Sequence, residues 1–269
     1  MEPLPLQRVA DVQPAAESLR GRVILIAGAL GGLGHATALA CAGAGATLVL
    51  CARKVKPLEA LYDEIEAMGG AQPALYPIDF EGATPQDYLD LAEAVRYQCG
   101  RLDGLVYAAV HFSGLRSIEQ TSPTEWLRNQ QVNVNAPYLL SQACLPLLRE
   151  APDAALVFAL DDGQRTNKAF WSGYGVAKAG VASLAAILHQ ETDSSAVRVH
   201  AVLPPPMRTA MRRMAYFGEN TMERETPERA GTAVAFLLGE GGHPLRGKTL
   251  DLRDFSDAEH PLSAASSAT

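Results

Sequence analysis

A tyrosine and a lysine stand four residues apart in the segment Ser-Gly-Tyr-Gly-Val-Ala-Lys, in which Tyr174 precedes Lys178. On an α-helix, residues at this spacing lie on one face, so a phenol would lie beside an ammonium group. A neighbouring positive charge favours the ionised phenol and lowers its pKa. The pair is therefore a candidate for proton transfer, with Tyr174 as the acid and Lys178 as the group that tunes it.

A glycine-rich turn lies far upstream of this pair, at residues 28–34, after a run of β-branched residues. An Ala-rich stretch typical of a helix follows it. Here Gly28 can form the tight turn, Gly32 lets the backbone approach a pyrophosphate, and Gly34 lets the helix pack on the strand. Leu33 lies between them, where free backbone amides of a helix start attract phosphate. The segment predicts a dinucleotide site, and an ordinary strand-to-helix turn is the alternative.

The end of the second expected strand indicates which dinucleotide would bind. An acidic residue at this place would accept the ribose hydroxyls of NAD, but the sequence has Ala52 followed by Arg53 and Lys54. A small neutral residue followed by cations suits a 2′-phosphate, through charge-assisted hydrogen bonds. NADP is therefore favoured over NAD, with a solvated basic loop as the alternative.

Strand and helix patterns alternate along the chain and would position these residues. The expected strands cover residues 22–27, 47–51, 74–78, 104–109, 154–160, 197–203 and 248–252. The expected helices cover residues 32–45, 56–69, 85–99, 123–149, 171–192 and most of 206–238. Such alternation predicts an α/β fold of the Rossmann type, a single-domain doubly wound parallel sheet with helices on both faces.

The chain divides into three predicted parts. Residues 1–20 contain Pro and Ala without a clear period and are expected to form an N-terminal arm. Residues 21–255 would form the Rossmann domain, since no linker or repeat interrupts them. Residues 256–269 are rich in Ser and Ala and are expected to be a flexible tail.

Composition excludes several classes of function. The net charge of -7 argues against nucleic-acid binding, which depends on many cationic contacts to phosphate. No apolar stretch is long enough to span a bilayer, and the first residues lack a signal-peptide pattern. We therefore expect a cytoplasmic protein without a membrane partner. The cysteines and histidines lack metal-ligand spacing, so no metal site is expected.

In order and spacing, these motifs resemble the classical short-chain dehydrogenase/reductase (SDR) family, nearest to its 3-oxoacyl-carrier-protein-reductase-like members. The resemblance covers about residues 22–252. It implies an oxidoreductase that interconverts a small-molecule carbonyl and an alcohol by hydride transfer with NADP(H). It also implies a homodimer or homotetramer, built through the helices at about 123–149 and 171–192.

The resemblance also implies roles for single residues. Tyr174 would be the general acid, Lys178 would also bind the nicotinamide ribose, and Asn133 would hold a water in a proton relay. Asp79, at the end of the third strand, would touch adenine. The remaining cofactor contacts would come from Ala108 and Thr209.

One departure from the family pattern lies at the reacting end. The substrate-orienting serine of the family falls thirteen residues before the tyrosine, and that position is Asp161, followed by Asp162. Serine can donate a hydrogen bond to a carbonyl, whereas an ionised carboxylate cannot. Asp161 would also disfavour the tyrosinate and pair with Lys178.

Two further segments depart from the family on the same side of the sheet. The Asn-Asn-Ala-Gly segment of the family is Tyr107-Ala108-Ala109-Val110, which loses polar groups that brace the strand ends. The Pro-Gly after the sixth strand is Pro204-Pro205, which stiffens the turn.

Two hypotheses therefore compete. The first is an NADP(H)-dependent oxidoreductase whose substrate, cationic or hydrogen-bond-donating, pairs with Asp161 or Asp162. The second is a non-catalytic protein of the same fold that binds nucleotide or partners as a sensor or scaffold. In either case, Met207–Met222 would form a lid over the site.

Overall fold

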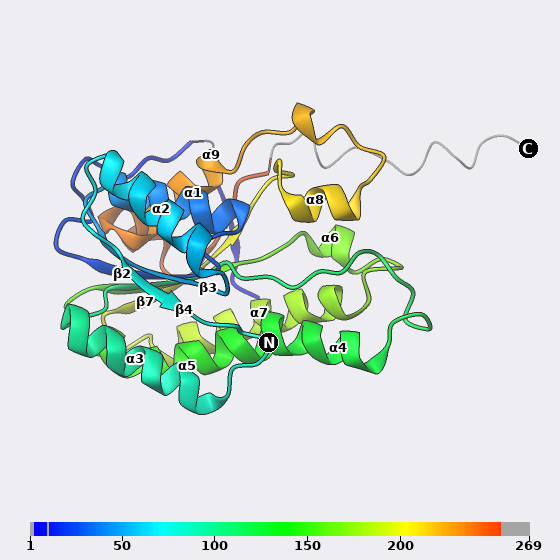
Figure 1. Ribbon diagram of the computed structural model, residues 1–269, viewed down its shortest axis with the longest axis horizontal. Coiled ribbons are helices and arrows are strands. Elements are labelled where there is room, and N and C mark those ends of the chain that lie inside the picture. Colours follow the sequence, from blue (N-terminus) through cyan, green and yellow to red (C-terminus); the bar gives the residue numbers. More distant parts are fainter. Residues whose placement is uncertain (1–2, 10, 254–269) are drawn as a thin grey trace, which may run out of the picture.

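Parallel strands form one central sheet between two layers of helices in the computed structural model, which describes residues 3–9 and 11–253 (Figure 1). Within that part of the chain the sheet has eight strands in the order β1-β8-β7-β6-β5-β2-β3-β4. The strands are β1 (Leu6–Arg8), β2 (Val23–Ala27), β3 (Thr47–Ala52), β4 (Ala74–Pro77), β5 (Gly104–Tyr107), β6 (Ala154–Ala159), β7 (Val197–Leu203) and β8 (Thr249–Asp251). The predicted doubly wound parallel sheet is confirmed.

The strand order reverses between β2 and β5, which are neighbours although β3 and β4 separate them in sequence. The chain first builds outward from β2 to one edge and then crosses to build the other half. At such a switch point the connecting segments diverge and leave a crevice at the carboxyl ends of the strands. The glycine turn after β2 and the segment after β5 therefore lie together.

Helices cover both faces of the sheet because its central strands are apolar on both sides. All five residues of β2 are buried, and the core divides into one cluster on each face. Figure 1 shows α1, α2 and α9 above the sheet and α3, α5 and α7 below it. The helices are α1 (Gly32–Gly43), α2 (Val55–Ala67), α3 (Pro85–Cys99), α4 (Pro123–Gln130), α5 (Ala136–Glu150), α6 (Gly163–Thr166), α7 (Ser172–Glu191), α8 (Ala210–Ala215) and α9 (Glu228–Leu238).

A π-helical turn, Gln131–Asn135, joins α4 to α5 where the sequence predicts one helix over 123–149. The apolar period alone does not distinguish a continuous helix from one that contains a wider turn. Such turns are frequent at functional sites, and this one carries Asn133.

The prediction of a mainly helical segment over 206–238 is wrong for most of residues 206–227. The short helix α8 is followed by turns and a single 3₁₀ turn, Thr221–Glu223, before α9 begins at Glu228. Ion pairs fix this irregular segment: Glu219 binds Arg212 at 2.6 Å and also binds Arg224. Ion pairs between side chains hold this segment where the prediction expected helical hydrogen bonds.

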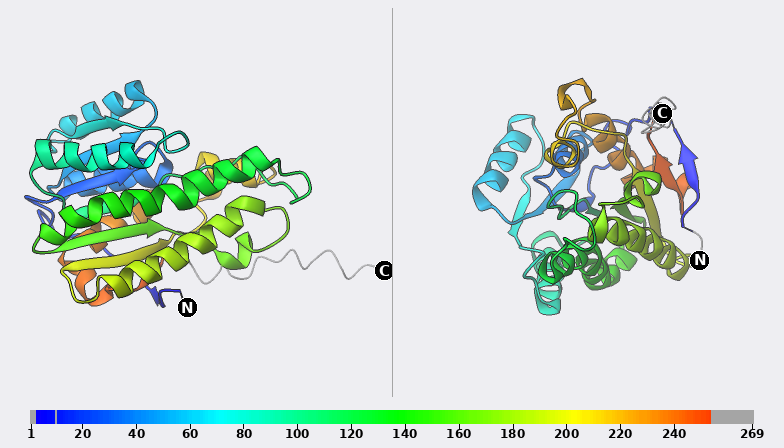
Figure 2. Two further views of the ribbon diagram at one scale, coloured as in Figure 1. Left: turned by 90° about the horizontal axis from the view of Figure 1, so that it is seen from below. Right: turned by 90° about the vertical axis from the view of Figure 1, so that its right-hand side faces the viewer.

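Residues near the N-terminus supply β1, which lies parallel to β8 at one edge of the sheet (Figure 2, right). Its three residues are exposed, so no apolar period marked it as a strand. Backbone bonds hold it instead, such as the one from Thr249 N to the Pro5 carbonyl at 2.9 Å. The division of the chain at residues 20 and 255 stays a prediction, and the expected tail lies outside the described residues.

No helix in the described part of the chain has both the length and the hydropathy needed for a membrane span. All four cysteines are free thiols, and three of them are buried: Cys41, Cys51 and Cys144. Within residues 3–9 and 11–253, no cluster of His, Cys, Asp and Glu could hold a metal ion.

Candidate active site and cofactor cleft

A cleft of about 170 Å³ opens at the switch point of the sheet. The glycine turn, the ends of β3, β4 and β5, and the π-helical turn contribute its walls. The lining residues that the sequence analysis named for a cofactor are Gly28, Arg53, Asp79 and Ala108. Its other lining residues are Leu30, Gly31, Ala52, Ile78, Phe80, Glu81, Ala109, Val110, His111 and Val132.

The glycine turn can form only if positions 28 and 34 carry no side chain. Gly28 has φ +87°, and a Cβ on it would lie 2.5 Å from the Cα of Ala109. A Cβ on Gly34 would lie 2.1 Å from the carbonyl oxygen of Gly28. Helix α1 then begins at Gly32 without a side-chain cap, so the amides of its first turn have no side-chain acceptor. This cradle fits the pyrophosphate of a dinucleotide.

The two cations after β3 take different positions. Arg53 is exposed and lines the cleft, whereas Lys54 is the N-cap residue of α2 and is not among the lining residues. Leu33 is a buried side chain of α1, so only its backbone can face a ligand. Thr209 caps α8 and places its methyl group against Gly32, where a Cβ would lie only 2.8 Å away. Thr209 thus borders the turn although it lies far away in sequence.

At the reacting end, Tyr174 donates a hydrogen bond from Oη to Oδ2 of Asp161, over 2.7 Å. Asp161 follows β6, and Tyr174 lies in the first turn of α7, where it is buried. Oδ1 of Asp161 accepts a bond from the backbone amide of Asp162 at 2.7 Å and an ion pair from Arg165. The structure therefore brings the phenol and the carboxylate together, as the spacing of thirteen residues suggested.

Lys178 does not form the predicted ion pair with Asp161. Its Nζ donates to the carbonyl oxygen of Ala159 at 2.8 Å and lies 5.7 Å from the centre of the Tyr174 ring. Burial lowers the pKa of Lys178 to about 8, and the charge of Asp161 opposes this in part. The phenol and the ammonium share a helix face, but the ammonium is directed to the end of β6.

The prediction of a lowered phenol pKa is wrong for this arrangement. Burial, and after it the charge and hydrogen bond of Asp161, raise the pKa of Tyr174 well above its usual value. The expected unfavourable effect of Asp161 on the tyrosinate is confirmed. Tyr174 is therefore a protonated donor at neutral pH.

The sequence analysis missed Arg165, which is the cationic partner of Asp161. The two residues are four apart, a spacing that pairs opposite charges on a helical turn, and this was the available signal. The guanidinium also lies 5.7 Å from the ring centre of Trp171 and 5.9 Å from that of Tyr216.

Asp162 also has a cationic partner, because Arg253 binds its carboxylate at 2.7 Å. Arg253 in turn binds Asp251 of β8 through two bonds of 2.9 Å. Both carboxylates offered as partners for a cationic substrate are therefore already paired within the protein.

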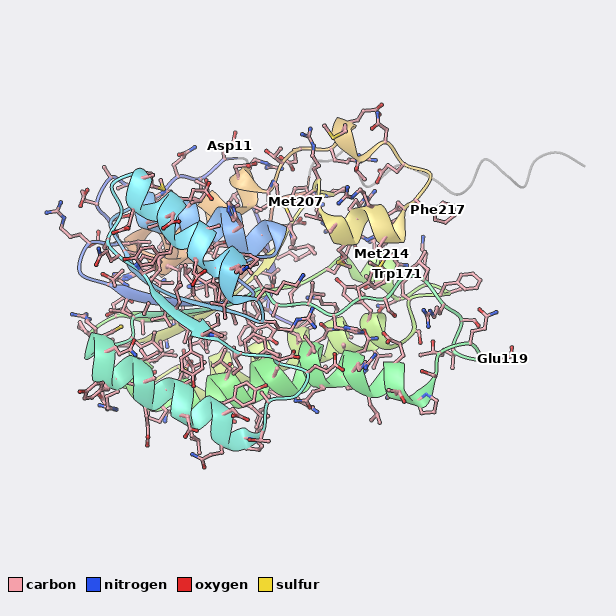
Figure 3. The ribbon with its side chains drawn as sticks, in the orientation of Figure 1. Asp11, Glu119, Trp171, Met207, Met214 and Phe217 are labelled. Atoms are coloured by element: carbon pink, nitrogen blue, oxygen red, sulfur yellow. The ribbon has the colours of Figure 1, made fainter. Side chains whose placement is uncertain are left out.

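Aromatic side chains close around the phenol. Phe112 lies 5.2 Å from the Tyr174 ring and 5.6 Å from Trp171, measured between ring centres. Sδ of Met211, in α8, lies 3.6 Å from the Tyr174 hydroxyl. Figure 1 shows α8 above α6, and in Figure 3 Trp171 lies below Met214 on this side of the molecule. The lid segment, residues 207–222, therefore covers the reacting end.

Asn133 is buried and braces the segment that follows β5. Its Oδ1 accepts from the amide of His111, and its Nδ2 donates to the carbonyl of the same residue, both at 2.8 Å. Tyr107 adds a second brace, with Oη donating to the Val132 carbonyl at 2.6 Å. These bonds replace part of the polar bracing that the family segment would have supplied. The water-holding role of Asn133 stays a prediction.

His111 and Glu125 form a second polar pair that the sequence analysis did not assign. Nε2 of His111 lies 2.7 Å from Oε1 of Glu125, and Asn129 also donates to this carboxylate at 3.1 Å. Burial acts to raise the pKa of Glu125, but the bonds from Ser113 and His111 outweigh it and lower the pKa. The pair lies beside both the cofactor cleft and the aromatic cluster.

Comparison with known proteins gives consistent matches. The family model described as short chain dehydrogenase matches residues 22–219. An uncharacterized oxidoreductase, YciK of Escherichia coli, is 30% identical over 239 residues, which cover 89% of this chain and 94% of the relative.

Solved structures match to the same extent. A short chain dehydrogenase from Pseudomonas syringae superposes with a TM-score of 0.85 at 34% identity, covering 91% of this chain and 100% of the other. A short chain dehydrogenase from Shigella flexneri, solved in complex with NADP, superposes with a TM-score of 0.84 at 30% identity. That match covers 88% of this chain and 98% of the other.

Proposed function

This chain belongs to the short-chain dehydrogenase family, and from that premise we propose that it is an NADP(H)-dependent oxidoreductase that interconverts a carbonyl and an alcohol. The observation that carries the proposal is the phenol of Tyr174 at the carboxyl end of the sheet, on the same helix as Lys178. It lies beyond the end of the cleft that starts at the glycine turn. A proton donor and a dinucleotide cradle are the two parts that such a reaction needs.

Support for NADP(H) comes from two directions. Relatives of similar fold have been solved with NADP and with NADPH, at 30% identity to this chain. In this chain, Arg53 borders the cleft where the adenosine ribose would lie, and no acidic side chain stands beside it at the end of β3. A guanidinium is well suited to a 2′-phosphate.

In the proposed reduction, the cofactor and Tyr174 have distinct roles. When bound, NADPH would supply a hydride to the carbonyl carbon of the substrate, and the electron pair of the C=O bond would move to oxygen. Tyr174 gives its proton to that oxygen, which yields the alcohol and leaves a tyrosinate. To do so, the phenol exchanges its bond to Asp161 for one to the substrate. Its raised pKa keeps the phenol in the protonated form that carbonyl reduction requires.

Cofactor binding and turnover test the proposal separately. A thermal shift with NADPH should exceed that with NADH, and NADPH should be oxidised with at least one compound of a carbonyl panel. Tyr174→Phe should keep the NADPH shift and lose turnover. Tight NADPH binding without turnover on any carbonyl would instead favour the sensor or scaffold.

We also propose a homodimer or homotetramer in the cytoplasm. Large apolar side chains stay exposed on the helices that the family resemblance assigns to the interface: Leu127 on α4, Tyr138 on α5 and Val176 on α7. Light scattering after gel filtration distinguishes monomer, dimer and tetramer. The free cysteines fit a reducing compartment.

A further inference from the structure

Arg165 has far more hydrogen-bonding capacity than the protein uses. A guanidinium carries five N–H donors, yet among the described residues the side chain of Arg165 donates only to Asp161. Its Nε is buried and has no partner in that part of the chain. An unsatisfied buried donor is costly, more so when it is charged, so this one calls for an explanation.

From this geometry we infer that Arg165 is the substrate-orienting donor of the active site and that it binds planar oxo compounds through their oxygen atoms. The inference rests on the proposed function, because it assigns a residue and a substrate class to the same reaction. It replaces the hydrogen bond that Asp161 cannot give.

The position of Arg165 supports this role. It is attached to Asp161, and Asp161 is bonded to the proton donor Tyr174. A substrate oxygen that accepts the phenol's hydrogen bond in place of Oδ2 of Asp161 would therefore lie near the guanidinium that binds Oδ1. Arg165 would then stabilise the negative charge that develops on this oxygen, as donors in an oxyanion hole do.

The charges around the site determine which net charge on a substrate the site favours. Arg165 pairs with Asp161, Arg253 is shared between Asp162 and Asp251, and Lys178 adds a positive charge when it is protonated. Because Asp161 and Asp162 are already paired with arginines, neither is free to bind a cation, and the structure does not support the expectation of a cationic substrate. Neutral and anionic oxygen acceptors fit better.

The aromatic side chains around Arg165 support a planar substrate. Trp171 and Tyr216 both contact the guanidinium, and Phe112 packs against Trp171. Aromatic faces favour flat ligands by stacking. A guanidinium fork favours two neighbouring oxygens over one, so the preferred class is a carbonyl with a second acceptor oxygen beside it, as in a 1,2-dicarbonyl.

Binding of benzoate to the NADPH-loaded protein, measured by calorimetry, tests the donor without any need for turnover. Benzoate is planar and presents two oxygens. Arg165→Met should weaken benzoate binding by roughly 10- to 100-fold, the loss expected for a charge-assisted pair. Arg165→Lys should lose part of it, because an ammonium keeps the charge without the fork. Arg213→Met is the matched control, since Arg213 is exposed on α8.

Turnover of 1-phenyl-1,2-propanedione gives the second measurement. Arg165→Met should lower kcat/KM by about 100- to 1,000-fold, as loss of an oxyanion donor does. Adding Asp161→Ser to Arg165→Met restores a neutral donor at the family position and should recover reduction of acetophenone, but not benzoate binding. A purely structural arginine would give neither pattern, and melting temperatures identify variants that fail to fold.

The outcomes separate the two proposals. Absence of benzoate binding to the wild-type protein, or equal binding by Arg165→Met, would overturn the role of Arg165. Benzoate binding that depends on Arg165, without reduction of any carbonyl, would uphold the binding site and overturn the oxidoreductase proposal.

Discussion

The cofactor end and the reacting end of this protein both lie at the carboxyl ends of the strands, but they are built by different means. The cofactor end is defined by missing side chains, at Gly28 and Gly34, and by free backbone amides. The reacting end is defined by charged and aromatic side chains that contact one another: Asp161, Arg165, Tyr174 and Trp171.

The difference shows where this chain keeps the family pattern and where it departs from it. A backbone cradle tolerates little change, because any side chain would collide with main-chain atoms. An assembly of side chains can be rebuilt residue by residue, provided that each buried charge keeps a partner. Here a carboxylate and a guanidinium pair beside the phenol.

The largest effect should come from Tyr174→Phe, which removes the proton donor and leaves the cradle intact. We expect turnover to fall by about 100- to 10,000-fold, the usual contribution of general acid catalysis, while NADPH affinity is unchanged. Steady-state kinetics and calorimetry measure the two quantities. Residual activity near the wild-type level would mean that another group donates the proton.

Gly34→Ala should have the opposite effect: it should weaken NADPH binding and leave the proton donor Tyr174 in place. The new Cβ would lie 2.1 Å from the Gly28 carbonyl, so the turn must shift. Overpacking of this kind costs about 1–3 kcal/mol, which corresponds to roughly 10- to 100-fold in NADPH affinity. Gly82→Ala is the control, since a Cβ there meets no described atom within 4 Å. Equal losses in both variants would contradict the cradle.

Arg53→Met should sharpen the comparison within the cofactor end. Loss of one charge-assisted contact to a 2′-phosphate should weaken NADPH binding by about tenfold, with NADH binding unchanged. Lys54→Met should have a smaller effect, because Lys54 does not line the cleft. A larger loss of NADPH affinity in Lys54→Met than in Arg53→Met would mean that Lys54, and not Arg53, binds the 2′-phosphate.

Asp161→Asn should have the smallest effect of the four substitutions, a shift in the pKa of Tyr174, and it acts only at the reacting end. The carboxylate raises the pKa of Tyr174, so removal of its charge stabilises the tyrosinate and should lower that pKa by about one unit or more. The chain has 8 tyrosines, so the ultraviolet titration is read as a difference against the same protein carrying Tyr174→Phe. An unchanged midpoint would assign the shift to burial alone.

The sequence predicted the parallel sheet, most of its strands, and the residues of the cradle. These features depend on local signals: apolar runs of strand length, helix periods, and glycines at fixed spacing. The strand β1 and the broken segment after β7 were missed for the opposite reason. Their backbone groups are satisfied by partners distant in sequence, such as Pro5 with Thr249, or by ion pairs such as Arg212 with Glu219.

The sequence alone determined that Tyr174 and Lys178 share a helix face and that a carboxylate lies thirteen residues before the tyrosine. Only the tertiary structure decided how these groups interact. Asp161 pairs with Arg165 and accepts a hydrogen bond from Tyr174, whereas Lys178 donates to the end of β6. The phenol is therefore protonated and packed among aromatic side chains. The reason is that a pKa depends on burial and on the nearest charges, and both are set by the packing of the whole chain.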